Sequence, residues 1–220
     1  MSSLAAEPAS DFLDEEVSVV AAEPARAVIL ACGAVAREVL AVVALNGWTH
    51  VDVRCLPAKL HSTPAQIPEA VDRKLRELAE RYDEIFVAYA DCGTAGALDA
   101  VLAGHGVERL PGAHCYGFLA GNDAWEQLHD AEPGTFYLTD FLARHFDALV
   151  WRGLGLDRHP ELLDSYFGNY RRLLYLAQTE DGTLVERARE AAARLGLAFE
   201  LVPTGYGDLR PSLERTFARA

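Results

Sequence analysis

The residues of this chain best suited to chemistry are its four cysteines, three of which stand beside a glycine or a histidine. Cys32 and Cys92 each precede a glycine, in "LACGAV" and "ADCGTA", and Cys115 follows a histidine in "AHCYG". Thiolate and imidazole are the ligands that zinc and other soft transition metals prefer. These positions therefore predict either metal ligation or thiol chemistry.

Apolar, strand-like runs alternate with helix-like segments along the chain. The pattern predicts strands at 26–32, 50–57, 84–90, 171–179 and 198–205, with another starting at 135. Amphipathic or glycine-terminated segments between them predict helices. This alternation is typical of α/β proteins, with a mostly parallel sheet and helices on both faces in a Rossmann-like three-layer sandwich. Such sheets bind ligands at the carboxyl ends of their strands, where Cys32 and Cys92 are expected.

The predicted metal ligands are Cys92, Cys115, Cys32 and His61. The chain has no C-x-x-C pair, which argues against a zinc ribbon or a thioredoxin-like site. Three protein ligands from separate loops, with one open position, would suit a catalytic zinc, although other soft-ligand metals accept the same groups. Cys55 is the weakest candidate because it lies within an alternating strand pattern. Free cysteines also commonly fill space in protein cores, so a purely packing role is the alternative.

Other polar groups are expected at the same sheet edge. Asp91 could orient a ligand or act as a catalytic base, and it could equally cap the helix that follows. Glu38 could point back toward the site as a second catalytic carboxylate, or it could face solvent. Gly33 and Gly93 are the predicted cofactor-binding positions, because N–H groups at the start of a helix favour an anion.

Composition and charge exclude several classes of function. The 220 residues carry a net charge of −13, which argues against binding nucleic acid or an anionic membrane surface. No apolar stretch approaches the roughly 20 residues that cross a bilayer. The N-terminus lacks the basic start and apolar block of a secretory signal. We therefore expect a cytoplasmic protein whose cysteines are reduced.

The first residues differ in composition from the rest. Residues 1–24 are acidic and rich in Ala, Pro and Ser, which predicts a disordered leader. Residues 25–220 are expected to form a single α/β domain. Neither the sequence pattern nor the charge indicates an oligomeric state.

Five blocks together resemble a known family: "ACGAVARE", "CLPAKLH", "AYADCG", "HCYGFLAG" and "EPGTFYLTDFLARHFD". Taken together they are similar to the bacterial and archaeal family called domain of unknown function 1638, from about Ala27 to Leu209. Members of that family often occur near corrinoid-dependent methyltransferase components. The resemblance therefore implies a role in one-carbon or corrinoid chemistry.

These observations predict a metal-binding protein, with zinc as the expected ion, that acts in corrinoid-linked methyl transfer. It would be a metal-dependent methyltransferase component whose partner is a corrinoid protein or a methyltransferase. The alternative is a non-catalytic accessory protein that holds a metal or a corrinoid and docks onto a methyltransferase. A third interpretation is an α/β scaffold whose cysteines are ordinary packing residues.

Overall fold

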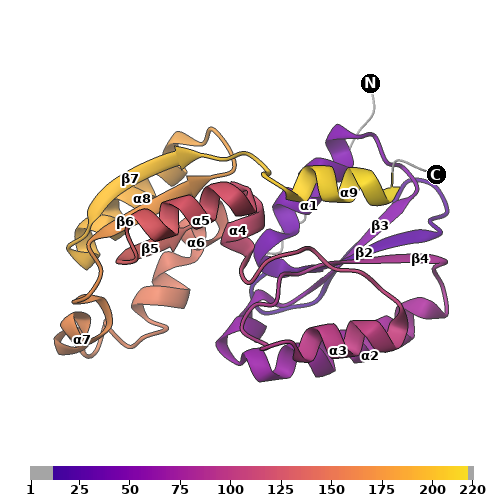
Figure 1. Cartoon of the computed structure of the whole chain (residues 1–220), viewed down its shortest axis with the longest axis horizontal. Coiled ribbons are helices and arrows are strands. Elements are labelled where there is room, and N and C mark those ends of the chain that lie inside the picture. The colour runs from indigo at the N-terminus through magenta and orange to yellow at the C-terminus, as the bar shows by residue number, and fades with distance from the viewer. Residues whose placement is uncertain (1–11, 218–220) are drawn as a thin grey trace. The chain divides into compact units, whose positions relative to one another are not determined.

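The computed structural model describes residues 12–217 of the chain, whose contacts separate it into two compact units (Figure 1). Among the described residues, unit 1 comprises 12–118 and 208–217, and unit 2 comprises 119–207. Each unit has its own β-sheet and its own helices.

The sheet of unit 1 has four strands among the described residues, in the order β1-β3-β2-β4. Its strands are β1 (Val17–Val19), β2 (Ala27–Cys32), β3 (Val51–Leu56) and β4 (Glu84–Ala88). The central strand β2 pairs in parallel with both β3 and β4, while the short edge strand β1 runs antiparallel to β3. All six residues of β2 are buried, which explains why its sequence is a continuous apolar run.

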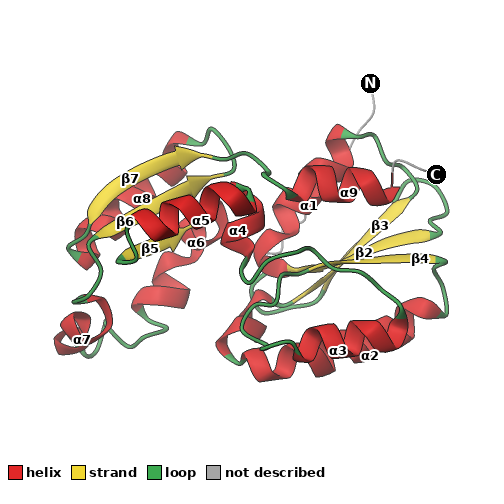
Figure 2. Ribbon diagram, in the orientation of Figure 1, coloured by secondary structure: helices red, strands yellow, loops and turns green. Residues whose placement is uncertain are grey.

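Helices cover both faces of this sheet. The helices of unit 1 are α1 (Ala36–Leu45), α2 (Ile67–Ala79), α3 (Ala97–His105) and α9 (Leu209–Phe217). Figure 2 shows α1 and α9 on one face and α2 and α3 on the other, which makes three layers. The short helix α4 (Cys115–Ala120) begins in this unit.

Unit 2 contains a parallel sheet in the order β5-β6-β7. Its strands are β5 (Thr135–Leu138), β6 (Arg172–Ala177) and β7 (Ala198–Pro203), and its helices are α5 (Asn122–Ala131), α6 (Asp140–Phe146), α7 (Leu163–Phe167) and α8 (Gly182–Leu195). Side chains of α6 and α8 pack with those of β5 and β6 in one hydrophobic core. None of the helices in the described chain is long and apolar enough to cross a membrane.

A buried carboxylate ties the end of β6 to the start of α6. Asp140 is fully buried and accepts hydrogen bonds from the Tyr175 hydroxyl at 2.6 Å, the Gln178 backbone N–H at 3.0 Å and the Thr179 hydroxyl at 2.5 Å. A buried charge of this kind is tolerated only when donors surround it. At the carboxyl edge of this sheet, the buried Asp140 carboxylate therefore has hydrogen-bond donors around it.

The predicted α/β class with mostly parallel strands is confirmed. The strands belong to two sheets, whereas the sequence suggested one, because alternating strands and helices do not reveal where one sheet stops and another begins. The single domain at 25–220 stays a prediction.

The predicted disordered leader at 1–24 is wrong for its second half, whereas residues 1–11 lie outside the described part. Phe12 is only 2% exposed, and its carbonyl accepts a hydrogen bond from Ala58 N–H at 3.0 Å. Val17 and Val19 belong to strand β1, paired with β3. The acidic composition concealed these few apolar residues, which are enough to add an edge strand.

Gly33 lies where three backbone segments meet. A β-carbon there would stand 2.2 Å from the Phe12 carbonyl oxygen, 2.9 Å from Ala58 N and 3.0 Å from the Leu56 oxygen. Only glycine fits such a close approach of backbone.

We expect Gly33→Ala to destabilise the protein by about 1–3 kcal/mol, because backbone atoms cannot move aside as a flexible side chain could. Gly104→Ala is the matched control, since a β-carbon at Gly104 in α3 meets nothing within 4 Å. That control should stabilise by about 0.5–1 kcal/mol through helix propensity. Urea denaturation of both variants measures the difference, and equal effects would contradict the packing argument.

Candidate thiol site

The parallel strands of unit 1 deliver three of the predicted site residues to one edge of the sheet. Cys32 is the last residue of β2, and His61 follows β3 in a short 3-10 helix, Ala58–Ser62. Cys92 follows β4 after only three residues. Because the carboxyl ends of parallel neighbours meet at the same edge, residues that are far apart in sequence become neighbours.

Cys32 and His61 are in direct contact. The Cys32 sulfur lies 3.6 Å from His61 Nδ1 and accepts a hydrogen bond from Ala34 N–H at 3.3 Å. His61 Nδ1 also lies 3.2 Å from the Ala58 carbonyl oxygen. Cys32 is 3% exposed. The imidazole is thus held between a thiol and a backbone acceptor, and its tautomer decides which of them it bonds.

The loop after β4 has an unusual backbone. Cys92 and Ala95 have φ angles of +54° and +53°, and Gly93 and Gly96 have +81° and +84°. The left-handed region is unfavourable for cysteine and alanine, so the surrounding contacts must hold this conformation. The loop separates the end of β4 from the start of α3 at Ala97.

Asp91 organises this loop. Its carboxylate accepts hydrogen bonds from the Thr94 hydroxyl at 2.8 Å, from Ala95 N–H at 3.1 Å and from Gly96 N–H at 2.9 Å. The Gly96 bond, followed by the others, lowers the pKa of Asp91. The N-cap of α3 is Gly96, without a side-chain hydrogen bond, so the predicted helix cap is wrong: Asp91 binds the loop and not the helix. The catalytic role of Asp91 stays a prediction.

Cys115 and Glu38 complete the site from other elements. The Cys92 N–H donates to the Ala113 carbonyl at 2.9 Å, which brings the loop beside the residue that starts α4, Cys115. Burial, followed by electrostatic interaction with Cys92, Cys32 and Glu38, raises the pKa of the Cys115 thiol. Glu38 is 4% exposed, so the alternative of a solvent-facing carboxylate is wrong. We refer to Cys32, His61, Cys92 and Cys115 as the thiol cluster.

Tyr89 is a member of the site that the sequence reasoning missed. It lies between β4 and the loop, is 1% exposed, and its ring is parallel to that of His61, at 4° and 6.4 Å between centroids. Its hydroxyl is buried without a hydrogen-bond partner of ordinary geometry among the described residues, although it interacts with the Cys32 thiol. The sequence signal that could have identified Tyr89 is its position near the end of the largely apolar strand predicted at 84–90.

Burial keeps the thiols of Cys32, Cys55 and Cys115 uncharged. Removal from water raises the pKa of Cys32 and of Cys55 from 9.0 to about 12, and it also raises that of Cys115. Burial opposes a charge on His61, but interactions with Cys92 and the Ala58 carbonyl raise its pKa overall. The thiols of Cys32 and Cys115 therefore lie, uncharged, near an imidazole whose pKa is raised.

Within residues 12–217, no three Cys, His, Asp or Glu side chains are arranged as they stand to hold a metal ion. The thiol cluster contains suitable donor types, but at least one side chain would have to rotate to complete a ligand set. Backbone atoms occupy the space around the α-carbon of Gly33 and leave no room there for a cofactor. A β-carbon on Gly93 would meet only Pro64, at 3.7 Å.

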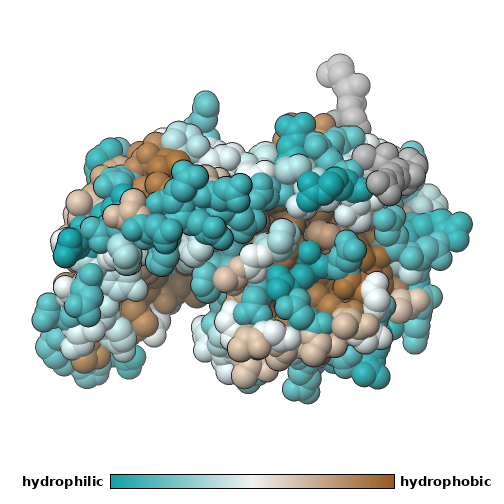
Figure 3. Space-filling model, in the orientation of Figure 1, coloured by the Kyte–Doolittle hydropathy of each residue, from teal (hydrophilic) through white to brown (hydrophobic). Residues whose placement is uncertain are grey.

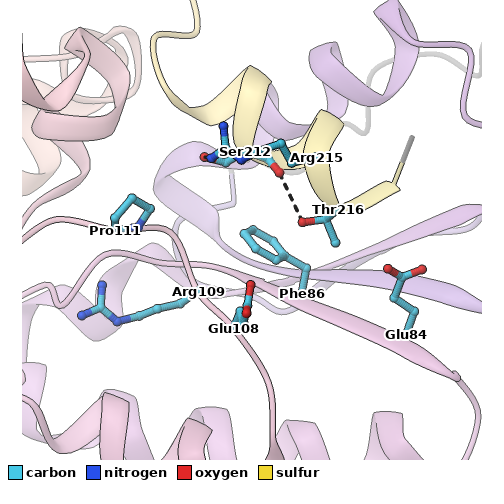
Figure 4. A pocket seen from close by; sticks show the side chains of 8 residues that line it. All are labelled: Glu84, Phe86, Glu108, Arg109, Pro111, Ser212, Arg215 and Thr216. Carbon is cyan, nitrogen blue, oxygen red and sulfur yellow. Dashed lines mark hydrogen bonds between the residues drawn. The ribbon is translucent and has the colours of Figure 1, made fainter. Parts of the chain in front are cut away.

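A cavity of about 710 Å³ lies elsewhere in unit 1, and no predicted site residue lines it (Figure 4). Its walls come from β4, from the segment after α3 and from α9: Glu84, Phe86, Glu108, Arg109, Pro111, Ser212, Arg215 and Thr216. Hydrophobic side chains are visible between α9 and α3 in Figure 3. Arg109 forms an ion pair with Asp99, with 2.6 Å between Nε and Oδ1. Arg215 donates a hydrogen bond to the Ser212 hydroxyl at 3.0 Å. This mixed-charge cavity indicates no particular ligand.

The raised thiol pKa values predict alkaline destabilisation of the metal-free protein. A thiol whose pKa is higher in the folded state stabilises it fully below the unfolded value, and this stabilisation is lost as the pH rises toward the folded value. For Cys55 the window runs from pH 9.0 to about 12.

We therefore expect the free energy of unfolding to fall across that window, by up to about 4 kcal/mol for a shift of this size. Cys55→Ala should make the fall shallower than in the wild type. Urea denaturation at several pH values between 8 and about 11 measures both proteins. Identical slopes would show that the buried thiol is not the cause.

The comparisons with known proteins identify a family without an activity. Residues 55–213 match the family described as "Protein of unknown function (DUF1638)". No curated protein matches the chain. Among solved structures, ornithine carbamoyltransferase from Pyrococcus furiosus is similar over 87% of this chain and 55% of its own, with 14% identity and a TM-score of 0.28.

The chain spans about half the length of that carbamoyltransferase, and a similarity of this size supports no argument about fold or activity. The family match, by contrast, covers more than half of the chain and confirms the resemblance that the sequence blocks suggested. The chain belongs to the DUF1638 family.

Proposed function

We propose that this protein binds a soft transition-metal ion, zinc in the first instance, at the thiol cluster of unit 1. The observation that carries the proposal is the convergence of three thiols and an imidazole from separate segments of the chain. Cys32 is in contact with His61, His61 interacts with Cys92, and Cys92 is held beside the start of α4, where Cys115 lies. Thiolate and imidazole are the preferred donors of zinc.

Binding of an ion would change the protonation state of Cys32. Burial raises the pKa of Cys32 to about 12, so the uncharged thiol dominates at neutral pH. A bound cation reverses this balance, because metal-ligating thiols are deprotonated. The ion would thereby turn an inert packed group into a nucleophile. Rotation of a cysteine side chain is part of the proposal, since the donors are not yet in ligand positions.

We further propose that the process served is one-carbon metabolism linked to corrinoids, in the cytoplasm. A metal-bound thiolate would accept a methyl group from a methylated corrinoid held by a partner protein. The thiolate electron pair forms the new S–C bond, and the Co–C electron pair remains on the corrinoid cobalt. The alternative is an accessory protein that holds the ion, or a corrinoid, without turnover and docks onto a methyltransferase. Cys32 and Cys92 are buried, whereas His61 and Cys115 are half-buried, so the cluster is only partly closed to water.

Metal analysis tests the binding proposal. The full chain, purified without chelator, should contain near-stoichiometric metal, and added Co²⁺ should give the intense near-ultraviolet absorption of thiolate-to-cobalt charge transfer. Cys32→Ala and Cys92→Ala should lose both signals, because each removes a soft donor. Cys55→Ala is the matched control, since Cys55 is equally buried on β3 but has no described contact with His61.

Absence of metal in the wild type, together with no charge-transfer band, would overturn the proposal. Equal loss in Cys55→Ala would instead indicate a general effect of cysteine removal on folding, which thermal melting of each variant would reveal.

Methyl transfer is measured separately, with methylcobalamin as the donor and the corrinoid absorption spectrum as the readout. We expect the metal-loaded wild type to demethylate the corrinoid, and Cys92→Ala to lose that activity. Metal binding without any demethylation would favour the accessory role.

A further inference from the structure

Strand β7 forms one edge of the sheet of unit 2, and no described segment pairs with its outer side (Figure 1). All six of its residues pair with β6 in a regular parallel register, without a bulge. Proteins usually protect such edges from other chains with short strands, charged side chains, bulges or a covering segment. In β7 the only charged residue is Glu200.

The other edge strands of the described chain are shorter or covered. Strand β1 has three residues and β5 has four. The outer side of β4 is closed by the segment after α3, because Val87 N–H donates to the Glu108 carbonyl at 3.0 Å and Leu110 N–H donates to the Val87 carbonyl at 3.2 Å. Strand β7 is therefore the longest edge strand in the described chain, and it lacks such a cover.

The backbone groups on the outer side of β7 follow from its pairing with β6. Ala198 N–H donates to the Arg171 carbonyl at 3.1 Å and Thr204 N–H donates to the Ala177 carbonyl at 2.9 Å, so the even-numbered residues face β6. Alternation then directs the N–H and C=O groups of Phe199 and Leu201 outward.

The outward donors end at both sides of this pair. Pro203 has no N–H, which suits an outward position on an edge strand. Leu197 N–H already donates to the Ala192 carbonyl at 2.9 Å. Two unpaired donors, at Phe199 and Leu201, therefore stand symmetrically about Glu200.

The side chains of β7 leave apolar surface at the same place. Leu201 is 39% exposed, and Phe199 on the same face of the sheet is half-buried at the border of the core of unit 2. Hydrophobic side chains are visible over β7 in Figure 3. On the opposite face, Glu200 forms an ion pair with Arg172, at 2.8 Å.

The surface made by α8 and β7 is electrically balanced. It carries three arginines and three glutamates, all exposed: Glu186, Arg187, Arg189, Glu190, Arg194 and Glu200. The chain as a whole has a net charge of −13. This face therefore selects neither a strongly basic nor a strongly acidic partner, and a second copy would meet no net repulsion there.

We propose that β7 pairs antiparallel with β7 of a second copy of this chain, about a two-fold axis at Glu200. Phe199 lies opposite Leu201 of the partner subunit, and Leu201 lies opposite the partner's Phe199. Each of these two pairs exchanges two N–H···O=C bonds, so all the unpaired outward donors are used. The two three-stranded sheets become one sheet of six strands.

Charge and sequence select this register among the symmetric ones. An axis at Leu201 would place Phe199 opposite Pro203, which has no N–H to donate. An axis at Phe199 would place Leu201 opposite Leu197, whose N–H is already used. In the proposed register Glu200 faces the partner's Glu200, but Arg172 beside each carboxylate offsets this repulsion.

Sedimentation of the full chain at a series of concentrations tests the proposal. One strand from each subunit is less than the roughly 20–30 residues a side of a standard interface, so we expect a dimer with a dissociation constant in about the micromolar range. Leu201→Lys should weaken the dimer at least about 10-fold, because each dimer contains the altered contact twice. Leu45→Lys in α1 is the matched control, since Leu45 is 62% exposed in unit 1, and it should change nothing.

Cross-linking tests the register without relying on Leu201→Lys. Residues opposite each other in a non-hydrogen-bonded antiparallel pair have β-carbons about 4.5–5.5 Å apart, so Glu200→Cys should form a covalent dimer under mild oxidation. Val202→Cys is its control, because Val202 would face the partner's Ala198 and find no thiol. The wild type under the same oxidation corrects for the native cysteines.

A chain that stays monomeric at every concentration would overturn the proposal. So would a dimer that Leu201→Lys leaves intact and that Glu200→Cys does not cross-link, because its interface would then lie elsewhere. Thermal melting of each variant identifies any loss of dimer that comes from unfolding. None of these outcomes depends on whether the thiol cluster binds a metal ion.

Discussion

The parallel pairing of β2 with both β3 and β4 is the constraint on which the thiol cluster depends. Hydrogen bonds on both sides fix the register of β2, with Cys32 opposite Leu56 at the end of β3. The segments that leave these three strands must then start at one edge. Cys32, His61 and Cys92 meet there although up to 60 residues separate them along the chain. A shift in register would separate the Cys32 sulfur from the imidazole.

The left-handed loop at 91–96 adds the second constraint. Asp91 accepts three hydrogen bonds from the loop, and these bonds offset the strain of left-handed backbone at Cys92 and Ala95. Backbone strain is typical of functional sites, and here it falls on a cysteine that lies beside other soft donors.

The carboxyl edges of the two sheets differ in chemistry. In unit 2 the edge is occupied by Asp140, a buried charge that three donors satisfy. In unit 1 the edge is occupied by thiols, which can be buried at little cost because they are only weakly polar. The thiols of unit 1 are therefore the groups that can still lose a proton when a cation binds. The family match at 55–213 includes His61, Cys92 and Cys115, while Cys32 precedes it.

The sequence by itself determined the α/β class, most of the strands, and the group of Cys32, His61, Cys92 and Cys115 as the place to look. Hydrophobic patterning and residue type are local properties, and local properties were sufficient for those conclusions. Only the tertiary structure decided that the strands form two sheets, that Phe12 and Val17–Val19 join the first, and that Glu38 is buried. It also decided that Asp91 accepts the hydrogen bonds of a loop and that Tyr89 belongs to the site. These outcomes depend on which distant segments pack together, and a pattern read along one chain contains no such information.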